Sequence, residues 1–313
     1  MENLIRGAFF GAAVGDALGG PVEMLTAAEI RDKYGMLREM VGGGWLNLEP
    51  GEWTDDTSMI LDVARGILAN PAYPLEEIGH NFIRWYRSGP KDIGKTTKES
   101  LNNYMKTGNW KEASRMTALT LNKMDSNGGL MRTLPVTLGY WNDMQKIAKW
   151  SAEICMMTHY SHDGATCCIF YNILARLAAG GGSRRQMVSR TLDLTDSFCR
   201  EMNIVPSKFF WHIIRFIQDG SPAATPRGNA LDTLAASVQA FLWTDSFEDA
   251  LLDVVNRGED TDTAGCITGG LAGIYYGYGN IPGRWLAALK KPEEIEQVAG
   301  EFASYWRQKG ISN

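Results

Sequence analysis

The sequences GAFFGAAVGDALG, at residues 7–19, and AGCITGGLAGIYYG, at residues 264–277, each carry a glycine at every fourth position. A glycine inside a helix costs about 1 kcal/mol relative to alanine, so two such rows require a compensating gain. Residues four apart lie along one ridge of a helix, and a bare ridge lets another backbone approach closely. We predict two helices at the centre of a bundle, each crossed closely by a neighbour. The alternative is that these glycines mark loops.

Most of the remaining chain repeats apolar residues at helical spacing. In MILDVARGIL, residues 59–68, one stripe contains Met59, Ile60, Val63 and Ile67. Convincing alternating patterns typical of strands are lacking, and the clusters of glycine and proline are too short to be flexible linkers. The sequence therefore predicts an all-α protein in which residues 1–313 form a single domain.

The composition limits the class of protein. Of the 313 residues, 44% are hydrophobic and 21% are charged, as in globular proteins with a sizeable core. The net charge of -5 argues against a broad nucleic-acid surface but leaves room for a local basic pocket. The five cysteines form no CxxC pair, which predicts reduced thiols in a cytoplasmic protein. The N-terminal apolar run is interrupted by Asp16 and Glu23, so we expect neither an export signal nor a membrane span.

Two acidic clusters stand just before apolar segments: TDDT at residues 54–57 and EDTDT at residues 259–263. A single acidic residue suffices to cap a helix start. Carboxylates held together without a cation repel one another and have raised pKa values, and a divalent ion removes that conflict. Oxygen ligands without cysteine or paired histidine favour Mg²⁺ or Mn²⁺ over zinc. The alternative is two independent caps on exposed helix ends.

Five motifs, taken in order, resemble the ADP-ribosylglycohydrolase family. They are GDALGGPVE (15–23), TDDTSM (54–59), SNGGLMR (126–132), THYSHDGA (158–165) and GEDTDTAG (258–265). The resemblance implies a single-domain orthogonal bundle of helices with a centre of two divalent cations, Mg²⁺ or Mn²⁺. Three further stretches, at residues 42–57, 89–97 and 281–290, are similar to family members that remove ADP-ribose from an arginine of the nitrogenase iron protein.

The resemblance also implies roles for individual residues. The implied metal ligands are Thr54, Asp55, Asp56, Asp260, Asp262 and Thr263. Asp92 is the expected principal acid/base, and Glu23 is the second catalytic candidate. Glu259 stands where a glycine is common in the family, and we expect its side chain to point to solvent, because glutamate is almost never buried unpaired.

The substrate-binding residues are expected around SNGGLMR and the TH pair. They are Ser126, Asn127, Gly128, Gly129, Arg132 and His159. Backbone amides around the two glycines can form an anion-binding nest for pyrophosphate. Arg132 either pairs with phosphate or braces a carboxylate within the fold. Trp45 either stacks on the nucleotide base from a rim loop or packs in the core, and His162 has no assigned role.

The implied reaction is hydrolysis of the bond between ribose and an arginine guanidinium. Such a site must stabilise positive character on the sugar and protonate the leaving nitrogen. The expected partners are an ADP-ribosylated protein substrate, namely the nitrogenase iron protein, and a regulatory protein of the PII type. The alternatives are cleavage of serine-, acetyl- or nucleobase-linked ADP-ribose, and a non-enzymatic binding module with the same fold.

Overall fold

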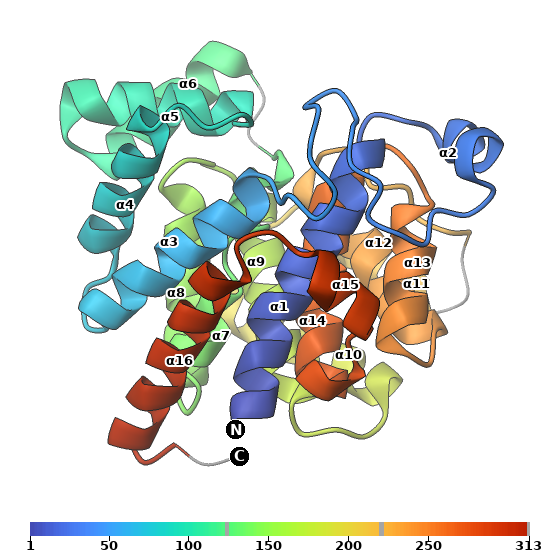
Figure 1. Cartoon of the computed structure of the whole chain (residues 1–313). Helices are drawn as coiled ribbons and strands as arrows, with labels where there is room; N and C mark the ends of the chain where they lie inside the picture. Colours follow the sequence, from blue (N-terminus) through green and yellow to red (C-terminus); the bar gives the residue numbers. More distant parts are fainter. Residues whose placement is uncertain (123–124, 219–221, 312–313) are drawn as a thin grey trace.

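The computed structural model describes residues 1–122, 125–218 and 222–311, and these ranges contain α-helices, three short 3-10 helices and isolated β-bridges but no β-strand (Figure 1). The prediction of an all-α fold is confirmed. The α-helices are α1 (Glu2–Gly19), α2 (Ala27–Tyr34), α3 (Asp55–Ala69), α4 (Leu75–Arg87), α5 (Lys95–Thr107), α6 (Trp110–Leu121), α7 (Pro135–Gly139), α8 (Met144–Met156), α9 (His162–Ala178), α10 (Arg184–Glu201), α11 (Lys208–Gln218), α12 (Ala230–Trp243), α13 (Phe247–Val255), α14 (Thr261–Tyr276), α15 (Gly283–Ala288) and α16 (Pro292–Gln308). The 3-10 helices are η1 (Gly20–Val22), η2 (Asn127–Gly129) and η3 (Tyr278–Asn280).

The two glycine rows form one interface at the centre of the molecule, where α1 and α14 lie side by side (Figure 1). The helices are antiparallel, because Gly7 faces Gly273 whereas Gly19 faces Thr261. A Cβ built on Gly269 would overlap the carbonyl oxygen of Gly11 and lie 2.8 Å from its carbonyl carbon. The predicted close crossing of central helices is therefore confirmed, with the addition that the two rows pack on each other.

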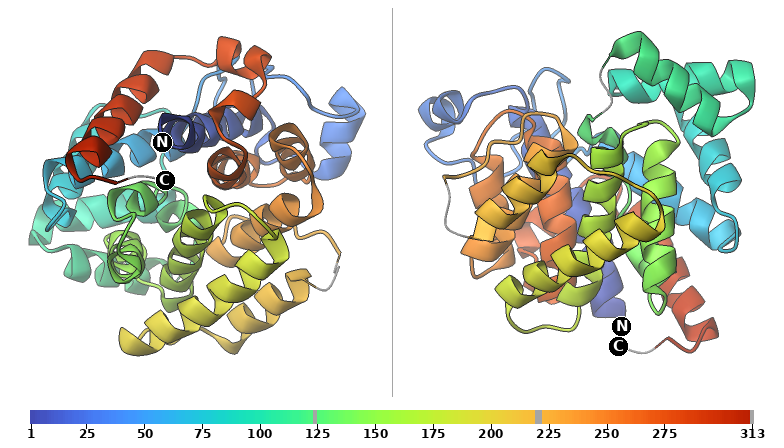
Figure 2. Two further views of the ribbon diagram at one scale, coloured as in Figure 1. Left: turned by 90° about the horizontal axis from the view of Figure 1, so that it is seen from below. Right: turned by 180° about the vertical axis from the view of Figure 1, so that it is seen from behind.

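The other helices surround this central pair. α16 packs against α1 and α3, and Phe9 and Phe302 join α1 to α16 with ring centroids 5.4 Å apart. α9 and α12 pack against α14, and α10 covers α9 on the side seen from behind in Figure 2. α4, α5 and α6 extend beyond α3 at one edge (Figure 1).

The antiparallel packing fixes where the site lies. Because α1 and α14 run in opposite directions, the end of α1 meets the start of α14, and the Thr261 hydroxyl donates to the Gly19 carbonyl at 2.9 Å. The start of α3 reaches the same place, since the Thr54 amide donates to the Asp16 carboxylate on α1. Two helix starts carrying the acidic clusters thus converge at the end of a third helix.

Two further sequence predictions concern cysteines and membrane spans. All five cysteines are buried free thiols, as predicted. No helix in the described ranges has both the length and the apolar character required to cross a bilayer.

Candidate metal centre and active site

A cavity of about 250 Å³ opens where α3 and α14 begin. Most of the predicted site residues line it: Glu23, Asp55, Asp56, Asp92, Ser126, Asn127, Gly128, His159, Asp260, Asp262 and Thr263. Thr54, Gly129 and Arg132 do not. The tertiary structure therefore gathers around one cavity segments that are far apart in the sequence, from Glu23 to Thr263.

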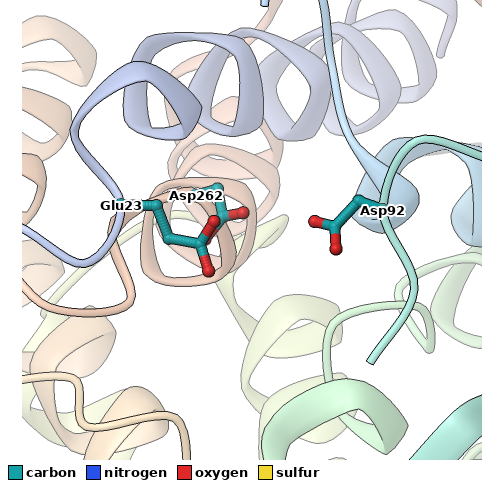
Figure 3. Close-up of side chains that lie close together, drawn as sticks. All are labelled: Glu23, Asp92 and Asp262. Carbon is teal, nitrogen blue, oxygen red and sulfur yellow. The ribbon is translucent and has the colours of Figure 1, made fainter. Parts of the chain in front are cut away.

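Carboxylates from three chain segments face one another in this cavity. Glu23, Asp92 and Asp262 each place a carboxylate oxygen within 4.8 Å of the others. Figure 3 shows Glu23 and Asp262 close together, with Asp92 opposite and pointing toward them. Glu23 follows η1, Asp92 lies in the loop before α5, and Asp262 belongs to the first turn of α14. This trio of oxygen donors has the chemistry and the proximity to hold a metal ion.

Local backbone contacts hold each member of the trio in place. The Met24 amide donates to the Glu259 carbonyl at 2.8 Å, and the Glu259 amide donates to the Leu25 carbonyl at 2.7 Å. These bonds tie the segment after Glu23 to the segment before α14. On the other side, the Gly94 amide approaches Asp55 Oδ2 at 3.4 Å and holds the Asp92 loop over the start of α3.

The burial of these acids raises their pKa values. Loss of hydration raises the pKa of Asp56 and of Asp262 well above the ordinary value, and neighbouring carboxylates raise both further. Burial also raises the pKa of Glu23 to about 7, against a smaller lowering by the hydrogen bond from Trp45. The apoprotein thus holds several carboxylates in a place that disfavours their charged form.

Two carboxylate oxygens in the cluster have no partner among the described residues. Asp56 Oδ1 and Asp260 Oδ1 are both buried and accept no hydrogen bond. Burying a charged acceptor without a partner is costly, and a hard divalent cation would satisfy both oxygens and reverse the direction of the pKa shifts. The donor set therefore fits Mg²⁺ or Mn²⁺: Asp55, Asp56, Asp260 and Asp262 offer carboxylate oxygens at the helix starts, and Glu23 and Asp92 line the same cavity beside them.

Asp16 is a site residue that the sequence analysis did not assign. It is fully buried on α1, and its carboxylate accepts from the amides of Thr54 and Thr57, each at 3.0 Å, and from their hydroxyls at 3.0 and 2.5 Å. Asp16 therefore fixes the first turn of α3, which carries Asp55 and Asp56. Burial raises the pKa of Asp16 to about 6, although these four bonds oppose the rise. The available signal was one acidic residue between Gly15 and Ala17, within the otherwise apolar run of residues 7–19.

A polar wall faces the acidic cluster. Asn127 donates to Asp260 Oδ2 at 3.0 Å and to the Thr233 hydroxyl at 3.1 Å. His159 Nε2 and the Ser126 hydroxyl share a hydrogen bond of 2.9 Å. Burial lowers the pKa of His159 well below its usual value, so the ring is neutral and can accept or donate one hydrogen bond at each nitrogen.

The two glycines of SNGGLMR lie in η2 and differ in their surroundings. A Cβ on Gly128 would lie 3.1 Å from His159 Cε1, within the cavity lining. Gly129 is buried, and a Cβ there would lie 2.6 Å from Cys155 Sγ. Close packing against these two side chains thus accounts for both glycines.

Arg132 lies behind the cavity wall. Its side chain is fully buried, and its guanidinium donates to the Ile154 carbonyl at 2.9 Å and to the Thr158 hydroxyl at 2.6 Å, over the Phe82 ring. These hydrogen bonds connect the segment after η2 with α8 and the residues that follow it. The partners expected from the sequence, a phosphate or a carboxylate, are not those found, because the side chain is directed into the core.

The structure shows the surroundings of Trp45, Glu259 and His162. Trp45 is 53% exposed at the rim, and its indole donates to Glu23 Oε2 at 2.5 Å, so the core alternative is wrong. Glu259 is exposed, as predicted, and its φ of 67° explains why glycine suits this position. His162 does not line the cavity, and its Nδ1 accepts from the Val205 amide at 3.0 Å.

Comparisons with known proteins find relatives that match nearly the whole chain. The chain is 33% identical to the ADP-ribosyl-[dinitrogen reductase] glycohydrolase of Rhodospirillum rubrum, over 95% of this chain and 93% of the relative. It is 31% identical to the ADP-ribosylarginine hydrolase Tri1 of Serratia proteamaculans, over 95% and 78% of the two chains. The human ADP-ribosylhydrolase ARH3 is 25% identical, over 94% and 91%.

A solved structure and a family model also match nearly the whole chain. The structure, described as an ADP-ribosylglycohydrolase-related protein complex, matches with a TM-score of 0.78 and 33% identity, covering 96% of this chain and 97% of that one. The family model for ADP-ribosylglycohydrolase matches residues 1–311. The chain therefore belongs to the ADP-ribosylglycohydrolase family.

Proposed function

We propose that this protein, acting as one domain of residues 1–313, hydrolyses the bond between ADP-ribose and an arginine side chain of a target protein. The observation that carries the proposal is the trio of Glu23, Asp92 and Asp262 at the edge of a polar cavity, within 4.8 Å of one another. Two relatives support the choice of bond and target: one is named an ADP-ribosylarginine hydrolase, and one is named for dinitrogen reductase, the nitrogenase iron protein. The nitrogenase iron protein is accordingly the proposed target.

The proposed cofactor is a pair of divalent cations, Mg²⁺ or Mn²⁺. The proposed ligands are Thr54, Asp55, Asp56, Asp260, Asp262 and Thr263. Support comes from the partnerless oxygens of Asp56 and Asp260 and from the raised pKa values of the clustered acids. Bound cations would supply positive charge that orients ribose hydroxyls and stabilises negative charge in the site.

Asp92 is the proposed acid/base. Burial raises its pKa, and the charge of Asp260 raises it further, so a proton is retained on Asp92 more readily than on an exposed aspartate. As the ribose C–N bond breaks, this proton passes to the leaving nitrogen of the arginine side chain. Water supplies the hydroxyl added to the anomeric carbon, and its other proton returns to the Asp92 carboxylate. Glu23, held by the Trp45 indole, is the second carboxylate beside the reacting carbon.

The polar wall is proposed to bind the ADP-ribose. The cavity wall opposite the acids offers the Ser126 hydroxyl, the Asn127 amide and the neutral His159 ring. It also contains Gly128, which has no side chain to keep a ligand away from the backbone. Arg132 is no longer proposed as a phosphate ligand, because its guanidinium is fully buried and bonded elsewhere. A PII-type regulatory partner stays a prediction of the resemblance. A cytoplasmic location is proposed on the basis of the five free thiols.

The test is release of free ADP-ribose from a panel of modified substrates in the presence of Mn²⁺. We expect release from an arginine-linked peptide and not from serine-, acetyl- or nucleobase-linked ADP-ribose. Asp92→Asn should lower turnover by about 10² to 10⁴-fold while calorimetry still detects Mn²⁺ and ADP-ribose binding. Asp193→Asn, an exposed aspartate on α10, is the matched control. Near-normal turnover by Asp92→Asn would remove Asp92 from the mechanism, and preference for another linkage would refute the arginine assignment.

A further inference from the structure

A second cavity of about 360 Å³ adjoins the first. Asp55 and Asp92 line both cavities, so these two carboxylates form a shared wall between them. Asp55 begins α3, and Asp92 lies in the loop that the Gly94 amide holds against Asp55. A molecule that occupied both cavities would therefore pass directly over the proposed acid/base.

The second cavity differs from the first in its two tryptophans. Polar and charged side chains line both cavities, but the second is also lined by Trp53, Trp85, Leu48 and Leu61, whereas no tryptophan in the described ranges lines the first. Both tryptophans are half-buried and pack against the core with part of their surface. Indole rings bind guanidinium groups by cation–π contact and cover the aliphatic stems of long side chains.

The basic residues around the second cavity do not make it an anion site. Arg65 lines it and pairs with Asp62 at 3.5 Å, and Lys91, Lys290 and Lys291 line it and each pair with a glutamate. The pairs are Lys91 with Glu52 at 2.7 Å, Lys290 with Glu49 at 2.8 Å and Lys291 with Glu294 at 3.7 Å. Their charge is compensated, so these lysines do not specifically recruit a phosphate.

Asp62 adds an acceptor at a distance from the shared wall. It lies seven residues after Asp55 on α3, hence about 10 Å further along the helix, and it lines the same cavity. The residue is 8% exposed, and its Oδ2 has no hydrogen-bond partner among the described residues. Arg65 approaches only the other oxygen, at 3.5 Å. An N–H donor from a bound chain would complete this carboxylate.

We propose that the second cavity binds the leaving group, that is, the arginine side chain and the adjoining residues of the ADP-ribosylated protein. The inference rests on the proposed function, because it places the ribose in the first cavity and the scissile bond at the wall formed by Asp55 and Asp92. Trp53 and Trp85 cover the arginine stem, and Asp62 accepts an N–H from the adjoining target residues. The protein substrate is thus bound on one side of Asp55 and Asp92, and the nucleotide is bound on the other side.

The experiment measures KM for an ADP-ribosyl-arginine peptide and the inhibition constant of free ADP-ribose. Trp53→Leu and Trp85→Leu should each raise KM about fivefold to tenfold, the equivalent of a lost cation–π contact, and leave inhibition by ADP-ribose unchanged. Asp62→Asn, which conserves volume, should raise KM for the peptide but not for the single modified amino acid, which lacks adjoining residues. Trp243→Leu, on a tryptophan 40% exposed at the end of α12, is the matched control.

The inference is overturned if KM is unchanged in all three variants. It is also overturned if the inhibition constant of ADP-ribose rises as much as KM, because the second cavity would then bind the nucleotide. Circular dichroism verifies folding, and Asp62→Asn keeps the test decisive if a tryptophan variant unfolds. If the wild-type protein hydrolyses no arginine-linked substrate, the proposed function fails, and the second cavity is then tested by tryptophan fluorescence with an unmodified arginine peptide. Quenching that Trp53→Leu abolishes supports the cavity, and no quenching refutes it.

Discussion

The interface between α1 and α14 leads to a quantitative prediction for Gly269→Ala. A Cβ on Gly269 would lie 2.8 Å from the carbonyl carbon of Gly11 and would overlap the oxygen. Since carbon atoms pack at about 3.5 to 4.0 Å, the two helices must separate by roughly 1 Å to admit this methyl group. Both helices are rigid and packed on several sides, so the separation extends along the whole row of glycines.

The expected magnitude follows from two opposing terms. Overpacking of a core costs about 1 to 3 kcal/mol, and a gap of 0.5–1 Å forfeits about a quarter to a half of each dispersion contact it opens. We expect the upper value, about 3 kcal/mol, because many contacts open together. Alanine returns about 1 kcal/mol of helix propensity relative to glycine. The net loss in the free energy of unfolding should be about 2 kcal/mol.

The assay is urea unfolding followed by far-UV circular dichroism, with the free energy obtained by linear extrapolation. Gly300→Ala is the matched control, because Gly300 lies within α16 and a Cβ there meets no atom within 4 Å. This control should gain about 1 kcal/mol from the same propensity term. If Gly269→Ala is as stable as the wild type, or if both variants change by the same amount, the close-packing argument is wrong.

Three further predictions concern the site and its borders. Asp16→Asn should weaken Mn²⁺ binding about 10- to 100-fold, measured by calorimetry, because the carboxylate that fixes the first turn of α3 is lost; unchanged affinity would contradict that role. In EDTA, the free energy of unfolding should fall as the pH rises from about 4 to about 7. Burial raises the pKa of Asp16 from 3.8 to about 6 and that of Glu23 from 4.5 to about 7. In this range the folded protein therefore binds more protons than the unfolded chain, and deprotonation destabilises the fold. Thermal melts should show that Mn²⁺ removes this fall, and a metal-free melting temperature that rises over the same range would refute the electrostatic argument. Glu259→Gly should raise the free energy of unfolding by about 0.5 to 1 kcal/mol in urea, because a left-handed φ of 67° strains a non-glycine residue; a loss of stability would show that the Glu259 side chain makes a contact of its own.

Local pattern was sufficient to predict the helical fold and the importance of the glycine rows. Helical periodicity predicts the fold class because the apolar residues that repeat at helical spacing lie on one face, and that face is buried in the core. The identity of each row's partner was not predictable, because any bare ridge can accept any other ridge. Only the folded chain shows that Gly11 meets Gly269 and that the two helices run antiparallel.

Some site residues were likewise predictable from local pattern, and others were not. Local sequence pattern alone predicted that Asp55, Asp56, Asp260 and Asp262 stand at helix starts, where unpaired amides and the helix dipole favour acidic residues. Other assignments depended on which way a side chain is directed after packing. Arg132 belongs to a motif that suits phosphate, yet its guanidinium is directed into the core and bonds there.

Asp16 and Trp45 acquire their partners only through packing between distant segments. Asp16 supports α3 because the packed core brings the start of α3 against the end of α1, where the Asp16 carboxylate accepts from the amides of Thr54 and Thr57. Trp45 becomes a partner of Glu23 because its loop folds back over η1. Both hydrogen bonds join residues that are distant in sequence, and no local pattern encodes such a pair, since the energy that forms it arises only when the whole core has packed.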